Sequence, residues 1–500
     1  MDMNNYLQMD IPELSGAMRR GELSVLELTA HFLNVIEKED PEIHAFITVD
    51  REGALRRARE LDGQPVSERR GRLYGIPVSV KDNLLTRGLR TTAGSAFLRD
   101  YVPATDAEAV KRLREEGAVI LGKTNLDEFG MGSKTENPVY GSTVNPVDPE
   151  RSPGGSSGGA AAALASGMCL LSFGTDTGGS VRQPAAYCGM FGIKPTYGAV
   201  SRNGLVAYAS SMDTVGVIAR NAADAALALS VIAGEDPKDS TSVPVPADYA
   251  LMTVPGNHGE KTIPGDHADM TFSGKALKDS LQGVSVGVLE EFLSADLLSD
   301  ESRAAVSSFA AFLTEYGASV TYVHLPETEL LVPVYYMLAS CEASSNLGRY
   351  DGIRYGTDLG TQGPLSDVYL GNRTAGFSSE VRRRILAGTY ILSEEHYTEL
   401  YLRAERARAR IRRAYRKALS SCDILLCPVV RGKAPFLSGK APYDDDLFTV
   451  GANLTGLPAC AVPVGPSSVQ LVGRPMAEGT LLSAAGVYEA VNAGERRTGK

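Results

Sequence analysis

Three serines lie among glycines in two short segments, GGSSGG at residues 154–159 and TDTGGS at residues 175–180. A flexible Gly/Ser linker would lie in polar, low-complexity sequence. Here the two segments enclose an apolar run of small residues, AAAALASGMCLLSFG at 160–174, which predicts a buried helix and strand. The glycines therefore indicate a phosphate cradle or a catalytic centre rather than a linker.

Neither of two familiar glycine-rich motifs fits well. A Walker loop requires GxxxxGK[ST], and neither segment ends in Gly-Lys-Ser/Thr. Residues 154–158 formally match the nucleophile elbow GxSxG, but an elbow follows a strand, and the preceding NPVDPERSP is too rich in proline to form one. A Ser-His-Asp triad would also need a distant histidine, and His324 and His396 stay open as candidates.

A serine nucleophile with a lysine base is the third alternative. Lys81 directly follows the apolar segment GIPVSV at 75–80, where the chain would leave a buried strand. Keeping a lysine neutral at pH 7 requires roughly 4 to 5 kcal/mol of destabilisation of the ammonium, which burial can supply. The alternative is that Lys81 forms an ion pair with its neighbour Asp82.

Ser180 is the stronger candidate nucleophile, because Thr177, Gly178 and Gly179 precede it. Glycines allow successive backbone N–H groups to converge on one point, so this turn predicts an oxyanion hole beside its own serine. Ser180 could also be the N-cap of a helix that begins at Val181.

The elements that must position these residues alternate between strands and helices. Residues 24–27 form a capping-box pattern for a helix that ends near Asp40, within a helical N-terminal layer at 1–70. From Tyr74 onward, short apolar strands alternate with helices, which predicts an α/β domain at 71–490 with a largely buried mixed sheet. Within it we expect a core motif block at 72–235 and a surface insertion at 253–276, followed by a flexible tail at 491–500. The basic stretch at 402–419 predicts a helix with a solvated face.

Composition limits the partners and the compartment. The net charge of −10, with acidic and basic residues interspersed, argues against a strongly basic nucleic-acid groove, so we expect any RNA contact to come through a partner. The chain has neither an apolar run of eighteen residues nor a signal-peptide pattern, which predicts a cytoplasmic protein. Its six cysteines form no CxxC, so we expect reduced, buried thiols and no metal site.

Longer segments resemble the amidase signature family. The resemblance rests on GIPVSVKDN, GGSSGG and DTGGSVRQPAAYCGMFGIKPTYGAVSRNGLVAYASSMDTVG, and it runs from about residue 9 to residue 490. Within the family, DEFGMGSKTEN, GEDPKDSTSV and SSNLGRYDGIRYG are similar to the glutamine-hydrolysing subunits of tRNA-dependent amidotransferases. The resemblance implies an amidase-signature α/β fold, with a mixed central sheet covered by helices on both faces.

The resemblance also implies a Ser-cisSer-Lys triad. Ser180 would be the nucleophile, Ser156 the serine after a cis peptide bond, and Lys81 the base. The oxyanion would lie against the N–H groups around Thr177, Gly178, Gly179 and Ser180.

For a glutamine substrate, the resemblance implies an arginine and an aspartate that hold the α-carboxylate and the α-ammonium group. Local sequence matches Arg384 and Asp446 to these roles, although the neighbours Arg383, Asp444 and Asp445 leave the register open. Four further residues are expected to line the same pocket: Tyr335, Tyr336, Met131 and Gly132.

The implied partners are the B and C subunits of the amidotransferase, glutamine, and misacylated tRNA. The B subunit would use ATP and Mg²⁺ to convert Glu-tRNA(Gln) into Gln-tRNA(Gln) with ammonia from this chain, which itself would bind no cofactor. The choice between tRNA(Gln) and tRNA(Asn) would reside in the partner. The alternatives are a stand-alone amidase and a catalytically silent scaffold subunit.

The chain departs from the family pattern in several places. CPVVRGKAPFL at 427–437 replaces a segment that is usually rich in Thr and Pro, and Lys134 stands where serine is usual. Residues 253–276 look inserted, and the C-terminal GPSSVQLVGRP is shortened. These departures bear on the pocket wall and the partner surface rather than on the triad.

Overall fold

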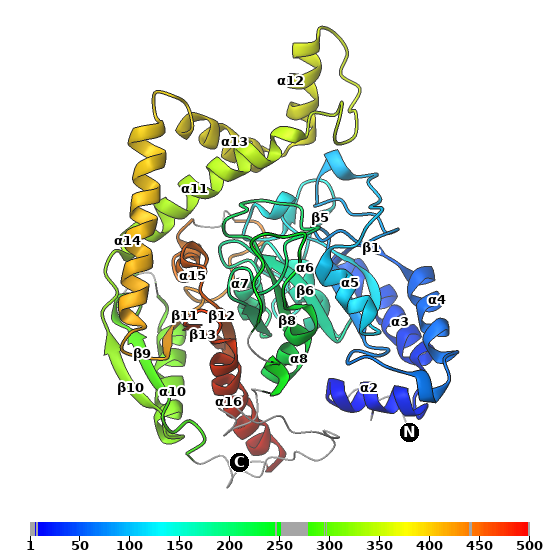
Figure 1. Cartoon of the computed structure of the whole chain (residues 1–500), viewed down its shortest axis with the longest axis vertical. Helices are drawn as coiled ribbons and strands as arrows, with labels where there is room; N and C mark the ends of the chain where they lie inside the picture. The colour runs from blue at the N-terminus through cyan, green and yellow to red at the C-terminus, as the bar shows by residue number, and fades with distance from the viewer. Residues whose placement is uncertain are drawn as a thin grey trace.

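The computed structural model describes residue 6 and residues 9–245, 248–251, 279–294, 296, 298–439 and 443–498. Its centre is a mixed sheet, which has eleven strands within these residues, in the order β1-β3-β2-β6-β8-β7-β12-β13-β11-β9-β10 (Figure 1). The strands are β1 (Phe46–Val49), β2 (Pro77–Lys81), β3 (Val119–Thr124), β6 (Leu171–Asp176), β7 (Phe191–Lys194), β8 (Thr214–Ala219), β9 (Ser285–Leu289), β10 (Ser319–Val323), β11 (Ile424–Pro428), β12 (Ala459–Val464) and β13 (Ser467–Gly473). A separate short hairpin pairs β4 (Glu136–Asn137) with β5 (Gly141–Ser142).

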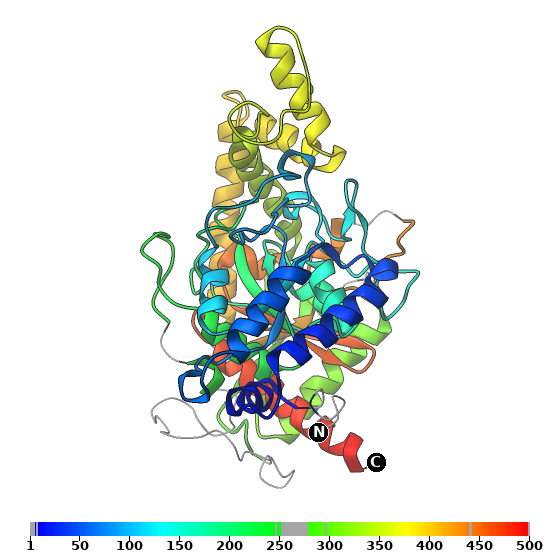
Figure 2. The same cartoon turned by 90° about the vertical axis from the view of Figure 1, so that its right-hand side faces the viewer.

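Helices cover the sheet, and the predicted α/β architecture is confirmed. The helices are α2 (Ile11–Arg20), α3 (Val25–Ile43), α4 (Arg51–Asp62), α5 (Glu108–Glu115), α6 (Gly158–Ala165), α7 (Arg182–Tyr187), α8 (Ala222–Ile232), α9 (Glu290–Leu293), α10 (Asp300–Glu315), α11 (Leu331–Asn346), α12 (Leu365–Gly376), α13 (Ser379–Ile391), α14 (Leu402–Ala418), α15 (Val450–Thr455) and α16 (Glu478–Thr498). Helices α11 to α14 extend away from the sheet, and α12 lies at the far end in both views (Figures 1 and 2).

Three neighbouring parallel strands decide where the site lies. β2 pairs in parallel with both β3 and β6, and every residue of these three strands is buried. Lys81 is the last residue of β2, as predicted, and Asp176 is the last residue of β6. Because the carboxyl ends of parallel strands meet at one edge of a sheet, Lys81 lies close to the turn at 177–180 that follows β6.

Close packing explains the glycines in GGSSGG. A Cβ on Gly159 would lie 2.5 Å from the carbonyl oxygen of Asn125 and 2.6 Å from that of Ala45. A Cβ on Gly155 would lie 2.7 Å from the backbone nitrogen of Lys134. These distances are shorter than a side chain tolerates, and the whole segment is buried. The segment is therefore a packed wall and not a linker.

The N-terminal layer contains the predicted helix and one strand that the sequence pattern missed. The hydroxyl of Ser24 accepts a hydrogen bond from the N–H of Glu27 (3.2 Å). α3 runs past the expected end at Asp40 to Ile43, and His44 ends it in a left-handed conformation (φ 56°). β1 then pairs with β3 at the edge of the sheet; at four residues it is too short to give an alternating pattern.

Three further predictions concern the basic helix α14, the C-terminal residues and the expected insertion. In α14 the basic side chains of Arg403 and Arg413 are exposed while Ile411 and Tyr415 are buried, which confirms the solvated face. The backbone of 491–498 continues α16 rather than forming a separate tail, in keeping with the Ala, Glu and Arg residues there. The predicted insertion at 253–276 lies outside the described residues. Within the described ranges, no helix is both long and apolar enough to cross a membrane.

A buried ion pair joins the sheet to α7. The guanidinium of the fully buried Arg182 donates to both carboxylate oxygens of Asp176 (2.9 and 3.0 Å) and to the side-chain oxygens of Asn453 and Gln470 (both 2.6 Å). Burial alone would raise the pKa of Asp176, but the charge and hydrogen bonds of Arg182 hold it well below its usual value. The pair therefore stays ionised in the core.

We predict that Arg182→Met lowers the free energy of unfolding by about 3–5 kcal/mol, because it leaves the Asp176 carboxylate buried without its cation. Urea denaturation measures the change. Arg416→Met, at an exposed position of α14, is the control and should stay within about 0.5 kcal/mol of wild type. Equal stability of the two variants would contradict the role given to the pair.

Candidate active site

Lys81 is bound to neutral oxygen atoms. Its Nζ donates to the hydroxyls of Ser156 (2.7 Å) and Ser157 (2.8 Å) and to the carbonyl of Thr175 (3.3 Å). The side chain is fully buried, and this desolvation lowers the pKa of Lys81 to about 7, although the more distant charges of three aspartates oppose the shift. Near neutral pH a substantial fraction of Lys81 is therefore the uncharged amine that a base requires.

Asp82 is not the partner of Lys81, so the alternative interpretation as a local ion pair is wrong. The carboxylate of Asp82 lies 3.6 Å from the ammonium of Lys123 and accepts hydrogen bonds from the N–H and the hydroxyl of Thr92. Successive side chains of an extended chain point to opposite sides, which turns Asp82 away from the Lys81 amine.

Ser156 follows a cis peptide bond between Gly155 and Ser156, as the family resemblance implied. The N–H of Gly155 donates to the side-chain oxygen of Gln183 (3.1 Å). The N–H of Ser157, a fully buried residue, donates to the carbonyl of Ser180 (3.1 Å). Hydrogen bonds from the backbone thus fix the Ser156 segment against the turn that carries Ser180.

The hydroxyl of Ser180 makes no hydrogen bond within the described part of the chain, and the residue is 7% exposed. α7 begins at Arg182 with Val181 as its N-cap and without a side-chain cap, so the idea that Ser180 caps this helix is wrong. The carboxylate of Asp176 instead lies at the N-terminus of the helix, where it accepts a hydrogen bond from the N–H of Val181 (3.1 Å). This arrangement leaves the Ser180 hydroxyl available for chemistry.

The structure leaves fewer N–H donors free for the predicted oxyanion hole than the sequence suggested. The N–H of Gly179 is already used, because it donates to Asp176 (2.9 Å). The N–H groups of Thr177, Gly178 and Ser180 make no hydrogen bond to any described residue and remain available to an oxyanion. The turn is held by the hydroxyl of Thr449, which donates to the carbonyl of Gly178 (2.6 Å).

A second polar cluster lies beside the turn and contains Arg384 rather than Arg383. The guanidinium of Arg384 is buried, lies over the rings of Tyr208 (5.5 Å) and Tyr336 (5.1 Å), and donates to the Tyr208 hydroxyl and to Glu380 (2.7 Å). Arg383 is exposed and pairs with Glu380 from outside. Arg384 is therefore the arginine that joins the cluster with Tyr208 and Tyr336.

Asp446 lies in the same cluster. The hydroxyl of Tyr336 donates to its carboxylate (2.7 Å), while the neighbouring Asp445 lies 3.5 Å from Arg431. Desolvation raises the pKa of Asp446 to about 6, against the lowering effect of the Tyr336 hydrogen bond and the charge of Arg384. The structure thus brings Arg384 and Asp446 together through Tyr336, as the resemblance implied.

Tyr335 packs on the turn that carries Ser180, and the expected pocket residues Met131 and Gly132 follow a glycine that lies close to Ser156. A Cβ on Gly178 would lie 2.5 Å from the hydroxyl of Tyr335, so this buried ring packs directly on the oxyanion turn. Met131 and Gly132 follow Gly130, where a Cβ would lie 3.6 Å from the Ser156 hydroxyl. Tyr335 and the segment at Gly130 therefore approach the Ser180 turn and Ser156 from different elements.

Sequence reasoning missed several residues that hold these groups. Asp176 lies within the TDTGGS segment, so its position was visible but its role as an acceptor for the turn was not. Tyr208 comes from an irregular segment far from Arg384, and Glu380 precedes Arg384 by one helical turn. The i,i+4 spacing of Glu380 and Arg384 is a signal that could have been used.

The two candidate histidines, His324 and His396, do not join the site. The ring of His324 is exposed and contacts Glu291, and His396 packs against Tyr390 (3.9 Å between ring centroids). No described residue set of three or more His, Cys, Asp or Glu is placed to hold a metal ion. The six cysteines are buried and unpaired.

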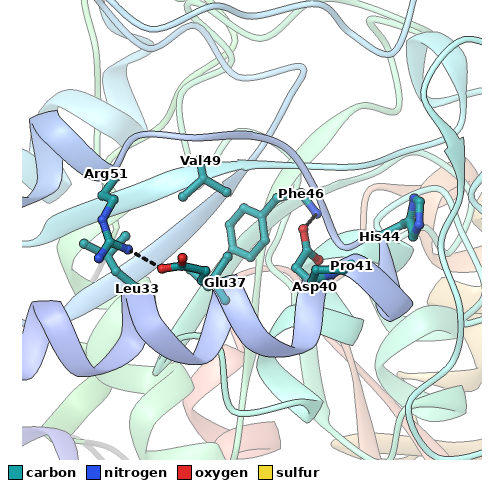
Figure 3. Close-up of a pocket in the computed structure, with 9 residues that line it drawn as sticks. Leu33, Glu37, Asp40, Pro41, His44, Phe46, Val49 and Arg51 are labelled. Carbon is teal, nitrogen blue, oxygen red and sulfur yellow. Dashed lines mark hydrogen bonds and ion pairs between the residues drawn. The ribbon is translucent and has the colours of Figure 1, made fainter.

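A pocket of about 560 Å³ lies elsewhere, between α3 and β1. Figure 3 shows its wall, where Arg51 pairs with Glu37 (3.2 Å) and the ring of Phe46 lies above α3. None of the predicted site residues lines it, so it is separate from the candidate active site.

The comparisons with known proteins agree with this geometry. A family model described as Amidase matches residues 27–482. The chain belongs to the amidase family. Among its amidase relatives, the A subunit of the glutamyl-tRNA(Gln) amidotransferase of Moorella thermoacetica is 45% identical over 489 residues, covering 95% of each chain.

Solved amidase-family structures share the fold. The A subunit of the glutamyl-tRNA(Gln) amidotransferase of Thermotoga maritima is 36% identical with a TM-score of 0.75, covering 97% of this chain and 95% of that one. The peptide amidase of Stenotrophomonas maltophilia is 29% identical with a TM-score of 0.80, covering 99% of this chain and 97% of that one. The predicted family and fold are confirmed.

The pKa of Lys81 generates a prediction about pH. We expect kcat/KM for amide hydrolysis to rise about tenfold per pH unit below pH of about 6 and to level off above about 8, because only the neutral amine accepts a proton. Initial rates in buffers of constant ionic strength measure the profile. In Lys81→Met the rise with pH should disappear, and the rate should fall by about 10²–10⁴-fold. A wild-type kcat/KM that does not change between pH of about 6 and about 8 would contradict a lysine base.

Proposed function

We propose that this chain is the glutamine-hydrolysing subunit of a tRNA-dependent amidotransferase. The observation that carries the proposal is the 2.7 Å hydrogen bond from a buried, partly neutral Lys81 to Ser156, beside a turn that presents a free Ser180 hydroxyl. The Arg384–Asp446 cluster adds a means of holding an amino acid. The relative at 45% identity, named for a glutamyl-tRNA(Gln) amidotransferase, favours glutamine as that amino acid.

The proposed reaction begins when the Ser180 oxygen attacks the side-chain carboxamide carbon of glutamine. Its proton passes to the Ser156 oxygen, and the Ser156 proton passes to Lys81. The oxyanion accepts hydrogen bonds from the free N–H groups of the turn at 177–180. Collapse of the tetrahedral intermediate transfers a proton back to the departing nitrogen, releases ammonia and leaves a glutamyl ester on Ser180. Water then hydrolyses this ester to glutamate.

Recognition of glutamine uses the second cluster. The buried guanidinium of Arg384 binds the α-carboxylate, since an arginine can bind a carboxylate through two parallel hydrogen bonds. Asp446, ionised above pH of about 6, binds the α-ammonium group. Tyr335 packs between this cluster and Gly178 and so sets the distance from the α-carbon to the reacting carbonyl.

The proposal includes partners. The relatives are named as one subunit of an amidotransferase. We propose that this chain passes ammonia to a B subunit, which uses ATP and Mg²⁺ to amidate Glu-tRNA(Gln), and that a C subunit supports the pair. This chain would bind no cofactor, and the complex would work in the cytoplasm. The specificity for tRNA(Gln) or tRNA(Asn) would come from the partner.

We predict that the chain, co-expressed with partner subunits, releases ammonia from glutamine and that misacylated tRNA with ATP increases the rate. Ser180→Ala should remove this release, because no other described hydroxyl occupies the position of the nucleophile in the turn. Cleavage of other carboxamides with glutamine ignored would instead indicate a stand-alone amidase. Absence of any acyl adduct on Ser180 and of any amide cleavage would indicate a scaffold subunit.

We predict that Arg384→Met raises the KM for glutamine by about 10–100-fold with a smaller change in kcat, because a charged hydrogen bond to the α-carboxylate is lost. Steady-state kinetics with coupled ammonia detection measures both constants. Arg383→Met is the matched control, since the exposed Arg383 lies one residue away on the same helix. An equal effect of both substitutions would contradict the assigned register.

A further inference from the structure

Lys134 joins two segments that lie far apart in the sequence. Its ammonium donates to the carbonyl of Leu437 (2.8 Å) and to the carbonyl of Gly439, and it lies 3.3 Å from the carboxylate of Glu136. The residue is only 4% exposed. A buried ammonium is costly unless its hydrogen bonds are satisfied, so the two carbonyls and Lys134 hold one another in place.

One side of this contact belongs to the wall of the active site. The carbonyl of Lys134 accepts a hydrogen bond from the Ser152 hydroxyl (2.9 Å), and the next residue, Thr135, donates its N–H to Asp127 (3.0 Å). The backbone nitrogen of Lys134 lies against Gly155, the residue before Ser156. Lys134 is therefore anchored on the segment that carries Met131 and Gly132 and cannot shift without moving that wall.

The other side is the segment 431–439. The guanidinium of Arg151 donates to the carbonyl of Ala434 (2.5 Å) and lies 4.1 Å from the ring of Phe436, and the N–H of Ser152 donates to the carbonyl of Pro435 (2.9 Å). These contacts fix the middle of the segment. At the end of the segment, the N–H of Leu437 donates to the carbonyl of Glu150 (3.1 Å), and the Lys134 side chain adds hydrogen bonds to the carbonyls of Leu437 and Gly439.

The same segment reaches the substrate cluster at its beginning. Arg431 lies 3.5 Å from the carboxylate of Asp445, the neighbour of Asp446. Val430 and Ala434 pack with Tyr187, and a Cβ on Gly154 would lie 2.8 Å from the Tyr187 ring. Both departures from the family pattern, Lys134 and the segment after Cys427, thus meet in one contact at the edge of the pocket.

We propose that Lys134 is a positioning residue for substrate specificity: it holds the segment 431–439 against the 131–136 wall and thereby fixes Asp446 relative to Ser180. This inference rests on the proposed function, because the α-ammonium group that Asp446 binds is a feature of glutamine. Amides that lack this group do not use Asp446. Loss of Lys134 therefore weakens binding of glutamine and leaves the chemistry at Ser180 intact.

The test is Lys134→Met in the complex with its partner subunits, assayed with glutamine and with propionamide, which has neither α-group. The expected result is a rise of about tenfold in the KM for glutamine, of the size that loss of a charged hydrogen bond gives, with kcat changed less than about twofold. The kcat/KM for propionamide should not change. Trypsin cleavage after Lys433 in the native protein should accelerate, a readout that does not depend on the substrate.

Two variants sharpen this test. Lys433→Met, at an exposed position of the same segment, is the matched control and should leave both amides at wild-type values. Lys134→Arg keeps the charge and the hydrogen-bond donors, so its KM for glutamine should lie between the values of wild type and Lys134→Met, closer to wild type. If Lys134→Met fails to fold, Lys134→Arg takes its place, and a KM above the wild-type value is expected.

The outcomes separate the two proposals. An unchanged KM for glutamine in both Lys134 variants, or an equal loss of kcat with both amides, would overturn the specificity role. A wild-type complex that leaves glutamine intact would overturn the proposed function; unchanged trypsin cleavage after Lys433 would then count against the positioning role by itself.

Discussion

Desolvation of the Lys81 amine is the constraint on which the rest of the site depends. An ammonium ion in water is stable, and only removal from water at the carboxyl end of β2 brings the pKa of Lys81 to about 7. The fold achieves this by placing β2 between two parallel strands, so that every residue of the strand that carries the base is buried. The order of the strands in the sheet therefore provides the desolvation that the lysine base requires.

Burial of a lysine is not sufficient, as two other buried lysines show. Lys123, on the adjacent strand, has a pKa of about 8 and lies 3.6 Å from the Asp82 carboxylate. Lys194 has a pKa of about 7 and donates to the carbonyl of Pro195 (2.7 Å), with no hydroxyl among its hydrogen-bond acceptors in the described part of the chain. Lys123 also donates to the hydroxyls of Thr86 and Thr91 (both 3.0 Å), so hydroxyl acceptors alone do not distinguish a base. Lys81 differs because its hydroxyl acceptors, Ser156 and Ser157, belong to the segment that is hydrogen-bonded to Ser180.

Local signals in the sequence pointed to Lys81 and Ser180, whereas the role of Ser156 came from the family resemblance alone. The apolar run before Lys81 and the glycine turn before Ser180 each reflect a backbone requirement that neighbouring residues reveal. The loss of Gly179 from the oxyanion hole was not predictable, because it depends on where the Asp176 side chain points after folding. The presence of β1 and the cap of α7 were not predicted for the same reason, because tertiary contacts decide both.

The choice between adjacent candidates for the proposed substrate residues shows a different limit of sequence-based prediction. Arg383 and Arg384 are adjacent and chemically identical, and only the packing of α13 turns Arg384 inward over Tyr208 and Tyr336. Likewise, Arg431 lies against Asp445 while Tyr336 selects Asp446. Where two adjacent residues have the same type of side chain, the sequence pattern identifies the pair, and only the packing in the folded chain shows which of the two points inward.

In the proposed function, chemistry and recognition come from different parts of the fold and meet at Gly178. The candidate triad lies on the sheet edge and the turn after β6, whereas Arg384 and Tyr336 come from α13 and α11. Tyr335 packs so closely on Gly178 that no side chain fits there, and Thr449 holds the carbonyl of the same residue. α11 and the oxyanion turn are therefore in direct contact through Tyr335. Under the proposed function, a shift of α11 would be transmitted to the N–H groups that bind the oxyanion, so binding of the amino acid and its cleavage are mechanically coupled at Gly178.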